Sequence, residues 1–298
     1  MSESSDDLIK GAYDFHVHTA PDVMNRSVND IEMAKLSKKY KMGGFIIKSH
    51  HSTSYGRAYL VKQIVKGINV FGGISLNNPI GGLNPQAVDT AGRMGAKIIW
   101  MPTVDSDNED GRFLDEHNPK LPFWATVQRE LYKKGMLKPS IKIRDANGGF
   151  KTEVYEIMDL VKDYDMILAT GHLKPSDGID IVNLALGRGL KKIIVTHPDF
   201  PTTFYNSEQQ KLIAKPGVYF EHCYTTPATN KIEWTAVIKQ LSETGADRNI
   251  LSTDLGQPGA LLPPEGYISF IKRLLEFGLD EDSIAKMTIY NQEKMLFS

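Results

Sequence analysis

Residues 166–197 read MILATGHLKPSDGIDIVNLALGRGLKKIIVTH, and this stretch contains one pattern twice. MILATGH and KIIVTH are short apolar runs of strand-forming residues, and they end in His172 and His197. Residues 179–188, between the two runs, have the periodicity of a helix. A strand, a helix and a second strand in this order form a unit whose strands lie parallel. The stretch therefore predicts a parallel sheet covered by helices.

The same alternation continues along the chain. Apolar runs such as FIIK and KIIWM indicate strands that are buried on both faces. Strands are predicted at residues 13–19, 44–50, 69–76, 97–105, 166–172, 192–197, 217–224 and 249–254. Eight strand and helix units in 298 residues predict a single α/β domain, residues 1–298, with a (β/α)8 barrel of the TIM type. A doubly wound open sheet usually has a glycine-rich phosphate loop after its first strand, and none follows Phe15.

Two segments exceed a minimal barrel. Residues 106–150 form an insertion after the fourth strand that is rich in Asp, Asn, Pro and Gly, with Phe123, Trp124 and a short helix expected near residues 124–135. A connection of this length is usually functional, often as a lid over a site. Residues 280–298 predict one more helix after the barrel closes.

Composition limits the classes of partner. The net charge of −1 comes from 35 basic and 36 acidic residues, which favours neither nucleic acid nor an anionic membrane surface. No apolar run approaches the length of about 18 residues that spans a bilayer. The polar N-terminus lacks a signal-peptide pattern, and the single cysteine, Cys223, excludes an internal disulfide. We therefore expect a cytoplasmic protein that binds neither nucleic acid nor a membrane, and a small-molecule substrate and a homo-oligomer stay open.

Histidines gather at the ends of the predicted strands. Of eight histidines, only His117 lies away from a strand end; the other seven are His16, His18, His50, His51, His172, His197 and His222. Asp254 ends the eighth strand. The carboxyl ends of all strands in a barrel meet at one rim, where active sites of this fold lie. We therefore expect these side chains to converge.

The spacing of these residues suggests a metal site. Side chains two residues apart in a strand point the same way, so His16 and His18 can both face the barrel interior, as can Lys48 and His50. Neutral imidazole is a good ligand for zinc and similar ions, and catalytic sites add a carboxylate. The predicted ligands of one or two divalent ions, zinc first and manganese as the alternative, are His16, His18, Lys48, His50, His172, His197 and Asp254.

This pattern resembles that of the amidohydrolase superfamily of metal-dependent hydrolases. In that family HxH ends strand one, single histidines end strands five and six, and an aspartate ends strand eight. The matching positions here are His16, His18, His172, His197 and Asp254, and Asn291 in the tail lies at the family's usual asparagine position. The resemblance covers nearly the whole chain. It implies hydrolysis by metal-activated water, with Asp254 as the general base.

The fourth strand departs from the family pattern. Binuclear members usually bridge two metals with a carboxylated lysine or a glutamate from its end, but KIIWMPTVD offers only Asp105 there. Lys48 on the second strand is a candidate for an unusual bridging carbamate, or for a cation that positions substrate. His50 is a candidate extra ligand. His197 or His222 could stabilise developing negative charge, and Lys48 with Arg144 could hold an anionic substrate group.

Three alternative functions stay open. A phosphoesterase of the polymerase-and-histidinol-phosphatase type also opens with a strand like DFHVHT, but its last motif generally reads Asp-x-His, whereas Leu255 and Gly256 follow Asp254 here. A mononuclear decarboxylase of the amidohydrolase superfamily uses a similar ligand set without a bridging lysine. A metal-binding barrel without catalysis is the third alternative.

Overall fold

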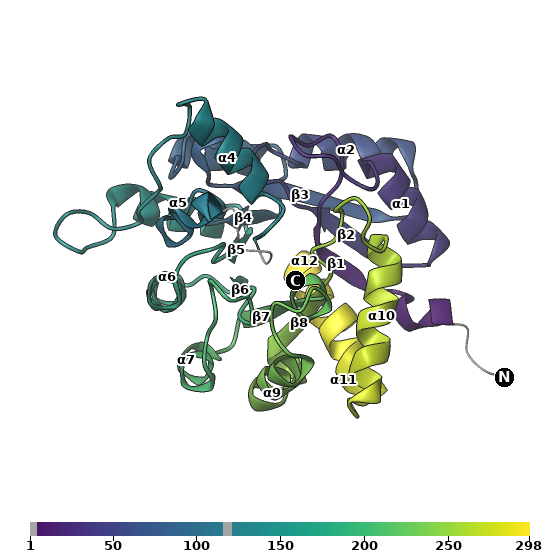
Figure 1. Cartoon of the computed structure of the whole chain (residues 1–298). Helices are drawn as coiled ribbons and strands as arrows, with labels where there is room; N and C mark the ends of the chain where they lie inside the picture. Colours follow the sequence, from purple (N-terminus) through teal and green to yellow (C-terminus); the bar gives the residue numbers. More distant parts are fainter. Residues whose placement is uncertain (1–4, 116–120) are drawn as a thin grey trace.

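A closed parallel barrel forms the centre of the molecule (Figure 1). The computed structural model describes residues 5–115 and 121–298. The strands pair in chain order, each parallel to the next. They are β1 (Tyr13–Val17), β2 (Gly44–Ile47), β3 (Asn69–Ser75), β4 (Ile98–Trp100), β5 (Ile167–Ala169), β6 (Ile193–Thr196), β7 (Val218–Cys223) and β8 (Asn249–Ser252). The predicted (β/α)8 fold is confirmed.

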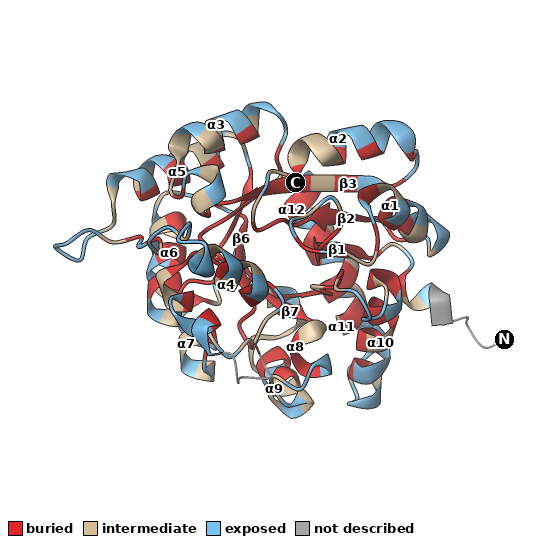
Figure 2. Cartoon of the chain, turned by 45° about the horizontal axis from the view of Figure 1, so that its top comes forward, coloured by how far each residue is buried: buried red, intermediate tan, exposed pale blue. Residues whose placement is uncertain are grey.

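Helices surround the strands, and their outward faces are exposed while the strands are buried (Figure 2). They are α1 (Asp30–Lys39), α2 (Tyr55–Ile64), α3 (Pro85–Arg93), α4 (Ala125–Lys133), α5 (Thr152–Asp163), α6 (Pro175–Gly187), α7 (Ser207–Ile213), α8 (Thr225–Ala228), α9 (Trp234–Thr244), α10 (Pro263–Glu276), α11 (Glu281–Ala285) and α12 (Asn291–Phe297). The predicted short helix near residues 124–135 corresponds to α4. The predicted tail helix is divided by a π-helical turn at Lys286–Tyr290.

The strands are shorter than the sequence predicts. The polar residues expected at the strand ends come after the last paired residue. β5 ends at Ala169, three residues before His172, and β8 ends at Ser252, two residues before Asp254. Apolar runs identify the buried sheet, but backbone pairing stops where the chain turns outward into loops. The candidate ligands at these strands therefore lie in the first residues of the loops, at the carboxyl rim of the barrel.

A bulge in β1 aims the first histidine into the barrel. Asp14 pairs with Phe45 of β2, and three residues later Val17 pairs with Ile47, so β1 holds one extra residue. Tyr13 and Phe15 belong to the interior cluster, whereas Val17 packs in the outer layer under the helices. The extra residue lets His16 face the interior directly after Phe15. Bulges re-aim side chains in this way.

β1 and β8 close the barrel through main-chain and side-chain bonds. The Asp254 amide donates to His16 O and the His18 amide donates to Leu255 O, both at 2.8 Å. Asp14 is fully buried and accepts from the amide of Thr253 at 3.0 Å and from its hydroxyl at 2.6 Å. The Asp14 carboxylate therefore fixes the first strand to the residue that precedes Asp254.

The C-terminal helix α12 covers the end of the barrel at which the strands begin. Met295 and Leu296 of α12 are buried in the interior cluster with Tyr13 and Ile98, near the starts of their strands. Asn291 donates through Nδ2 to Asn249 O at 2.7 Å and to Ala246 O at 2.8 Å. The predicted asparagine thus joins the last helix to the start of β8, far from the rim.

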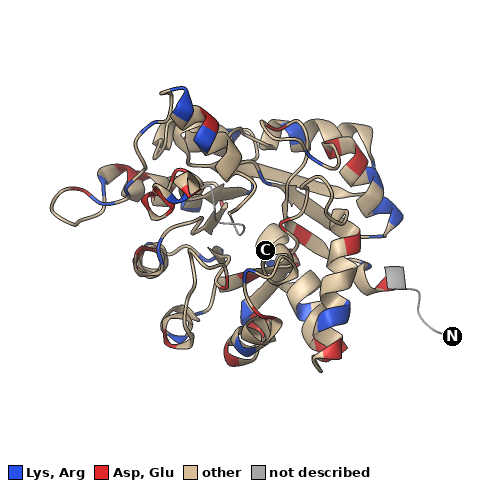
Figure 3. Ribbon diagram, in the orientation of Figure 1, with Lys and Arg blue, Asp and Glu red and all other residues tan. Residues whose placement is uncertain are grey.

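The surface outside the barrel carries mixed charge. Lys and Arg alternate with Asp and Glu over the outer helices, without one dominant patch in the view of Figure 3. Within residues 5–115 and 121–298, no helix combines the length and the apolar character that crossing a bilayer requires. His117, which the sequence placed in the insertion, lies outside the described residues.

The hydrogen bonds between Asp14 and Thr253 lead to a first prediction. Asp14→Ala leaves buried donors unpaired and should lower the free energy of unfolding by about 3 kcal/mol, whereas Asp14→Asn keeps an acceptor and should cost less than about 1 kcal/mol. Urea unfolding in the presence of a chelator measures both. An equal loss of unfolding free energy in the two variants would contradict a stabilising role of these hydrogen bonds.

The same residue predicts a pH dependence. Burial raises the pKa of Asp14 to about 7, so the folded protein holds this proton more tightly than the unfolded chain, whose carboxyl has its ordinary pKa of 3.8. The stability that Asp14 contributes is therefore full at acidic pH and falls as pH rises from about 4 to about 7. Asp14→Asn should lack this component when unfolding is measured across that range. An unchanged pH profile in the variant would contradict the assignment.

Candidate metal centre

Five buried histidines form a closed ring at the carboxyl end of the barrel. The ring centres of His16 and His18 are 5.3 Å apart, and those of His18 and His50 are 5.0 Å apart. His172 lies 5.7 Å from His50 and 5.7 Å from His197, and His197 returns to His16 at 4.8 Å. His16 lies within β1, and the other four histidines follow β1, β2, β5 and β6. The structure therefore brings together all five predicted histidine ligands.

Asp254 completes this ring at β8. Its Oδ1 lies 3.1 Å from His18 Nε2 and 3.3 Å from His16 Nε2. Its Oδ2 accepts from the Thr225 hydroxyl at 2.9 Å. Burial opposes ionisation of Asp254, but His16, His18 and His197 outweigh burial and hold the pKa of the carboxyl well below its usual value. Asp254 is therefore an anion at neutral pH.

The histidines are neutral in the same conditions. Burial is the main cause that lowers the pKa of each of the five, and it brings the pKa of His18 to about 4. Neutral imidazole keeps a free lone pair on one nitrogen, which is the form that binds a metal. The ring therefore offers lone pairs next to one carboxylate.

Two of these residues have a strained backbone. His197 has φ +47° and Asp254 has φ +54°, in the left-handed region that residues with a Cβ seldom adopt. Gly256 follows with φ +136°, and a Cβ there would lie 1.8 Å from His18 O. The close approach of this loop to β1 thus requires glycine. Such strain is typical of functional sites, where the surrounding structure holds it in place.

Polar groups behind the histidines orient their individual imidazole rings. Glu221 Oε2 lies 3.2 Å from His16 Nδ1, and this contact fixes the orientation of the His16 imidazole. Thr103 Oγ1 lies 2.9 Å from His50 Nδ1, and Glu109 Oε1 lies 3.4 Å from His172 Nδ1. Partners of this kind fix ring orientation and raise ligand basicity in metal sites.

Lys48 lies inside the barrel among these groups. Its side chain is fully buried, and Nζ has no hydrogen-bond partner among the described residues. Burial lowers its pKa, and its ammonium contributes to lowering the pKa of all five histidines. Nζ lies 5.6 Å from the ring centre of Trp100. Trp100 is the last residue of β4, and its side chain is buried in the interior cluster.

Asp105, the other candidate near β4, has different partners. Its Oδ2 accepts from the Asn78 amide at 2.8 Å, and its Oδ1 accepts from Gln128 Nε2 at 2.7 Å. Gln128 lies on α4, so Asp105 anchors the insertion to the barrel. Both carboxylate oxygens already have partners outside the histidine ring.

Two residues expected to contact substrate lie elsewhere. His222 points out of the barrel, with Nδ1 3.1 Å from Asp199 Oδ2 and Nε2 3.1 Å from Asn249 Oδ1. β7 alternates, so Glu221 and Cys223 face inward and His222 cannot. Arg144 donates to Asp177 at 2.7 Å and pairs with Asp180 on α6. The expectation that either residue binds substrate is corrected by this placement.

The donor set fits a divalent cation. The ligand atoms of His16, His18 and Asp254 lie within 4.8 Å of one another, as do those of His16, His197 and Cys223. His197 Nδ1 is buried without a hydrogen-bond partner among the described residues. Imidazole nitrogens with one carboxylate are the donors that zinc and related ions prefer. A bound cation would satisfy these nitrogens.

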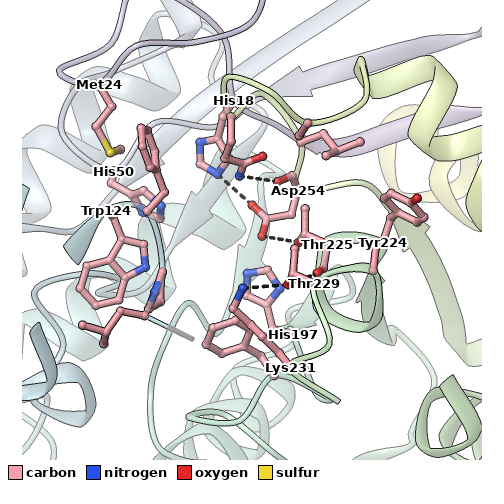
Figure 4. A pocket seen from close by; sticks show the side chains of 18 of the residues that line it. His18, Met24, His50, Trp124, His197, Tyr224, Thr225, Thr229, Lys231 and Asp254 are labelled. Carbon is pink, nitrogen blue, oxygen red and sulfur yellow. Dashed lines mark hydrogen bonds and ion pairs between the residues drawn. The ribbon is translucent and has the colours of Figure 1, made fainter. Parts of the chain in front are cut away.

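A cavity of about 520 Å³ opens beside the ring (Figure 4). His18, His50, His172, His197 and Asp254 line its floor. Leu121, Pro122, Phe123 and Trp124 from the insertion line one wall, and the segment from Tyr224 to Lys231 lines another. The insertion predicted to cover a site therefore borders this cavity.

Comparison with known proteins gives a family and a fold. Residues 11–221, from β1 into β7, match the model described as "Family of unknown function (DUF6282)". The chain belongs to this family. No curated protein matches the sequence.

Solved structures resemble the whole chain. An amidohydrolase from Pseudomonas aeruginosa has a TM-score of 0.65 at 10% identity, covering 99% of this chain and 98% of that one. A candidate 2-pyrone-4,6-dicarboxylic acid hydrolase from Pseudomonas putida has a TM-score of 0.59 at 11% identity, covering 96% and 97%. The organophosphorus hydrolase from Deinococcus radiodurans has 0.56 at 15%, covering 98% and 94%. At these identities the likeness shows the fold, so the resemblance to amidohydrolases is confirmed at that level.

Several site residues were not predicted. Asp14 and Glu221 are buried carboxylates that hold the closure and His16, and Thr225 donates to Asp254. A period-two reading of β7 could have found Glu221, because Tyr219 is apolar and two residues before it. Nothing local marks Thr225, whose role depends on β7 and β8 lying side by side.

The contact between Glu221 and His16 predicts an effect on metal affinity. Glu221→Gln removes the carboxylate that orients His16, so affinity for zinc should fall about tenfold or more. Competition with a chromophoric chelator measures this affinity. Glu156→Gln, on the exposed face of α5, is the matched control and should bind as the wild type does. Equal affinity in both variants would contradict the role of Glu221.

Proposed function

We propose that this protein is a metal-dependent hydrolase that cleaves an amide, an ester or lactone, or a phosphoester bond of a small molecule. The observation that carries the proposal is the ring of His16, His18, His50, His172 and His197 closed by Asp254 at the carboxyl rim. A cavity lies directly over it. The hydrolases among the structural neighbours support the same reaction class, including organophosphorus and lactone substrates.

The metal site would be formed by residues of this ring. His16, His18 and Asp254 would hold one ion, and His172 with His197 would face a second position. Zinc is the first candidate and manganese the alternative. A bound ion supplies a Lewis acid that polarises a carbonyl or phosphoryl oxygen and acidifies water.

Asp254 is the proposed general base. It is anionic, lines the cavity and has one oxygen facing His16 and His18. It would take the proton from the attacking water and pass it to the leaving group, a role that contributes about 10²–10⁴-fold. His197 also lines the cavity and would stabilise negative charge that develops on the substrate. The aromatic walls would exclude bulk water from the reaction.

A mononuclear decarboxylase of the same superfamily is the second candidate. One observation favours it: β4 ends in the apolar Trp100, and both oxygens of Asp105 beyond it have partners outside the histidine ring. If Lys48 is not carboxylated, no described side chain at that position supplies a bridging carboxylate. The two candidates therefore differ in the number of metal ions and in the state of Lys48.

Asp254→Asn provides a test of the reaction. The variant keeps the size of the side chain but loses the base, so hydrolysis of activated aryl esters, lactones and phosphotriesters should fall at least about 100-fold. Asp247→Asn is the control, because Asp247 is exposed and its ion-pair partner among the described residues is Lys286. Turnover by the wild type that is insensitive to both a chelator and Asp254→Asn would contradict a metal-dependent hydrolase.

Lys48→Ala addresses the number of ions. If Lys48 bridges two ions as a carbamate, the intact wild-type protein should carry the added mass of CO₂ and two metals per chain, and the variant should lose metal. If Lys48 positions substrate as a cation, the variant should keep its metal and raise KM. Native mass spectrometry with metal analysis separates these outcomes. A variant identical to the wild type in metal content and KM would exclude both roles.

A further inference from the structure

Aromatic side chains line the cavity next to the five histidines. Trp124 lies against His172, with ring centres 6.2 Å apart, and Phe200 lies against His197 at 5.7 Å. Phe123 and Tyr224 also line the cavity. A ligand that reaches the histidines therefore lies against flat apolar side chains. Such walls favour a planar apolar group of similar size.

Two cations line the same cavity, and their partners differ. Arg26 donates through Nε and Nη2 to Asp22 Oδ2, at 2.9 and 2.7 Å, so its charge is compensated. Lys231 Nζ donates to the neutral hydroxyl of Thr229 at 2.9 Å and makes no ion pair with a described residue. Nζ also lies 5.8 Å from the ring centre of Phe200. Lys231 is thus a cation that makes no ion pair among the described residues, and Asp254 is the anion that acts on it to raise its pKa.

The loop after α8 fixes the position of Lys231. Its amide donates to Thr226 O at 3.1 Å, and Asn230 before it adopts φ +54°. The Thr229 hydroxyl donates to Thr225 O at 2.6 Å, and Thr225 contacts Asp254 (Figure 4). The Thr229 hydroxyl accepts one of the three Nζ protons of Lys231, so the other two stay available to a ligand. Two donors match the two oxygens of a carboxylate.

We propose that Lys231 binds a carboxylate on a small substrate whose flat apolar body lies between Trp124 and Phe200. The inference rests on the proposed function, because the hydrolysable bond would then lie at the histidine ring and the carboxylate beside it, at Lys231. The substrate class is an ester, lactone or amide that carries a free carboxylate on an aromatic-sized body. Burial lowers the pKa of Lys231, so an anion that replaces lost solvation is favoured there.

Binding of benzoate and of its neutral isostere benzamide tests the proposal without turnover. Calorimetric titration of the protein as purified, and again after chelator treatment, should give about tenfold tighter binding of benzoate in both forms. Lys231→Met should lose this preference and Lys231→Arg should keep it. Lys239→Met, an exposed lysine of α9, is the control and should behave as the wild type. Circular dichroism confirms that each variant is folded.

Three results would overturn the proposal. They are equal binding of benzoate and benzamide by the wild type, an unchanged preference in Lys231→Met, and loss of the preference on metal removal alone. The last would place the carboxylate on the ion instead of Lys231. Failure of the proposed function has a different signature, namely no metal and no hydrolysis in a protein whose benzoate preference still depends on Lys231.

Discussion

The closure between β1 and β8 is the constraint on which the candidate centre depends. Asp14 holds Thr253, and the main-chain bonds of His16 and His18 hold Asp254 and Leu255. These bonds place Asp254, 236 residues after His18, at 3.1 Å from His18. Without closure, the last strand would end at one edge of an open sheet and its carboxylate would lie far from the first histidines. The bulge in β1 then turns His16 toward the same point.

Burial governs the chemistry of the centre. It keeps five imidazoles neutral, and it makes an unpaired ammonium at Lys48 expensive, because a buried charge without a partner loses its hydration. A cation bound by the histidines would repel that ammonium further. The structure thus favours a neutral or modified Lys48. The state of Lys48 and the number of ions are therefore linked.

The sequence predicted most of the residues of the candidate site, but the predicted positions of His222 and Arg144 were wrong. His16, His18, His172, His197 and Asp254 could be predicted because strand ends converge in any closed barrel. His222 was misplaced because it is next to Glu221, and only one of two adjacent strand residues can face inward. Arg144 was misplaced because a residue in a long insertion has no periodicity to fix its direction, and its partners lie on α6.

By itself the sequence determined the alternation of strand and helix, since apolar runs and helical periodicity are local properties of the chain. It also determined which residues are chemically able to bind a metal. Only the tertiary structure decided which of them meet, because ligand distances depend on register, on the bulge in β1 and on the β1–β8 closure. The partners Glu221, Thr225 and Glu109 likewise came from tertiary structure, since a contact between distant segments has no signature in either segment alone.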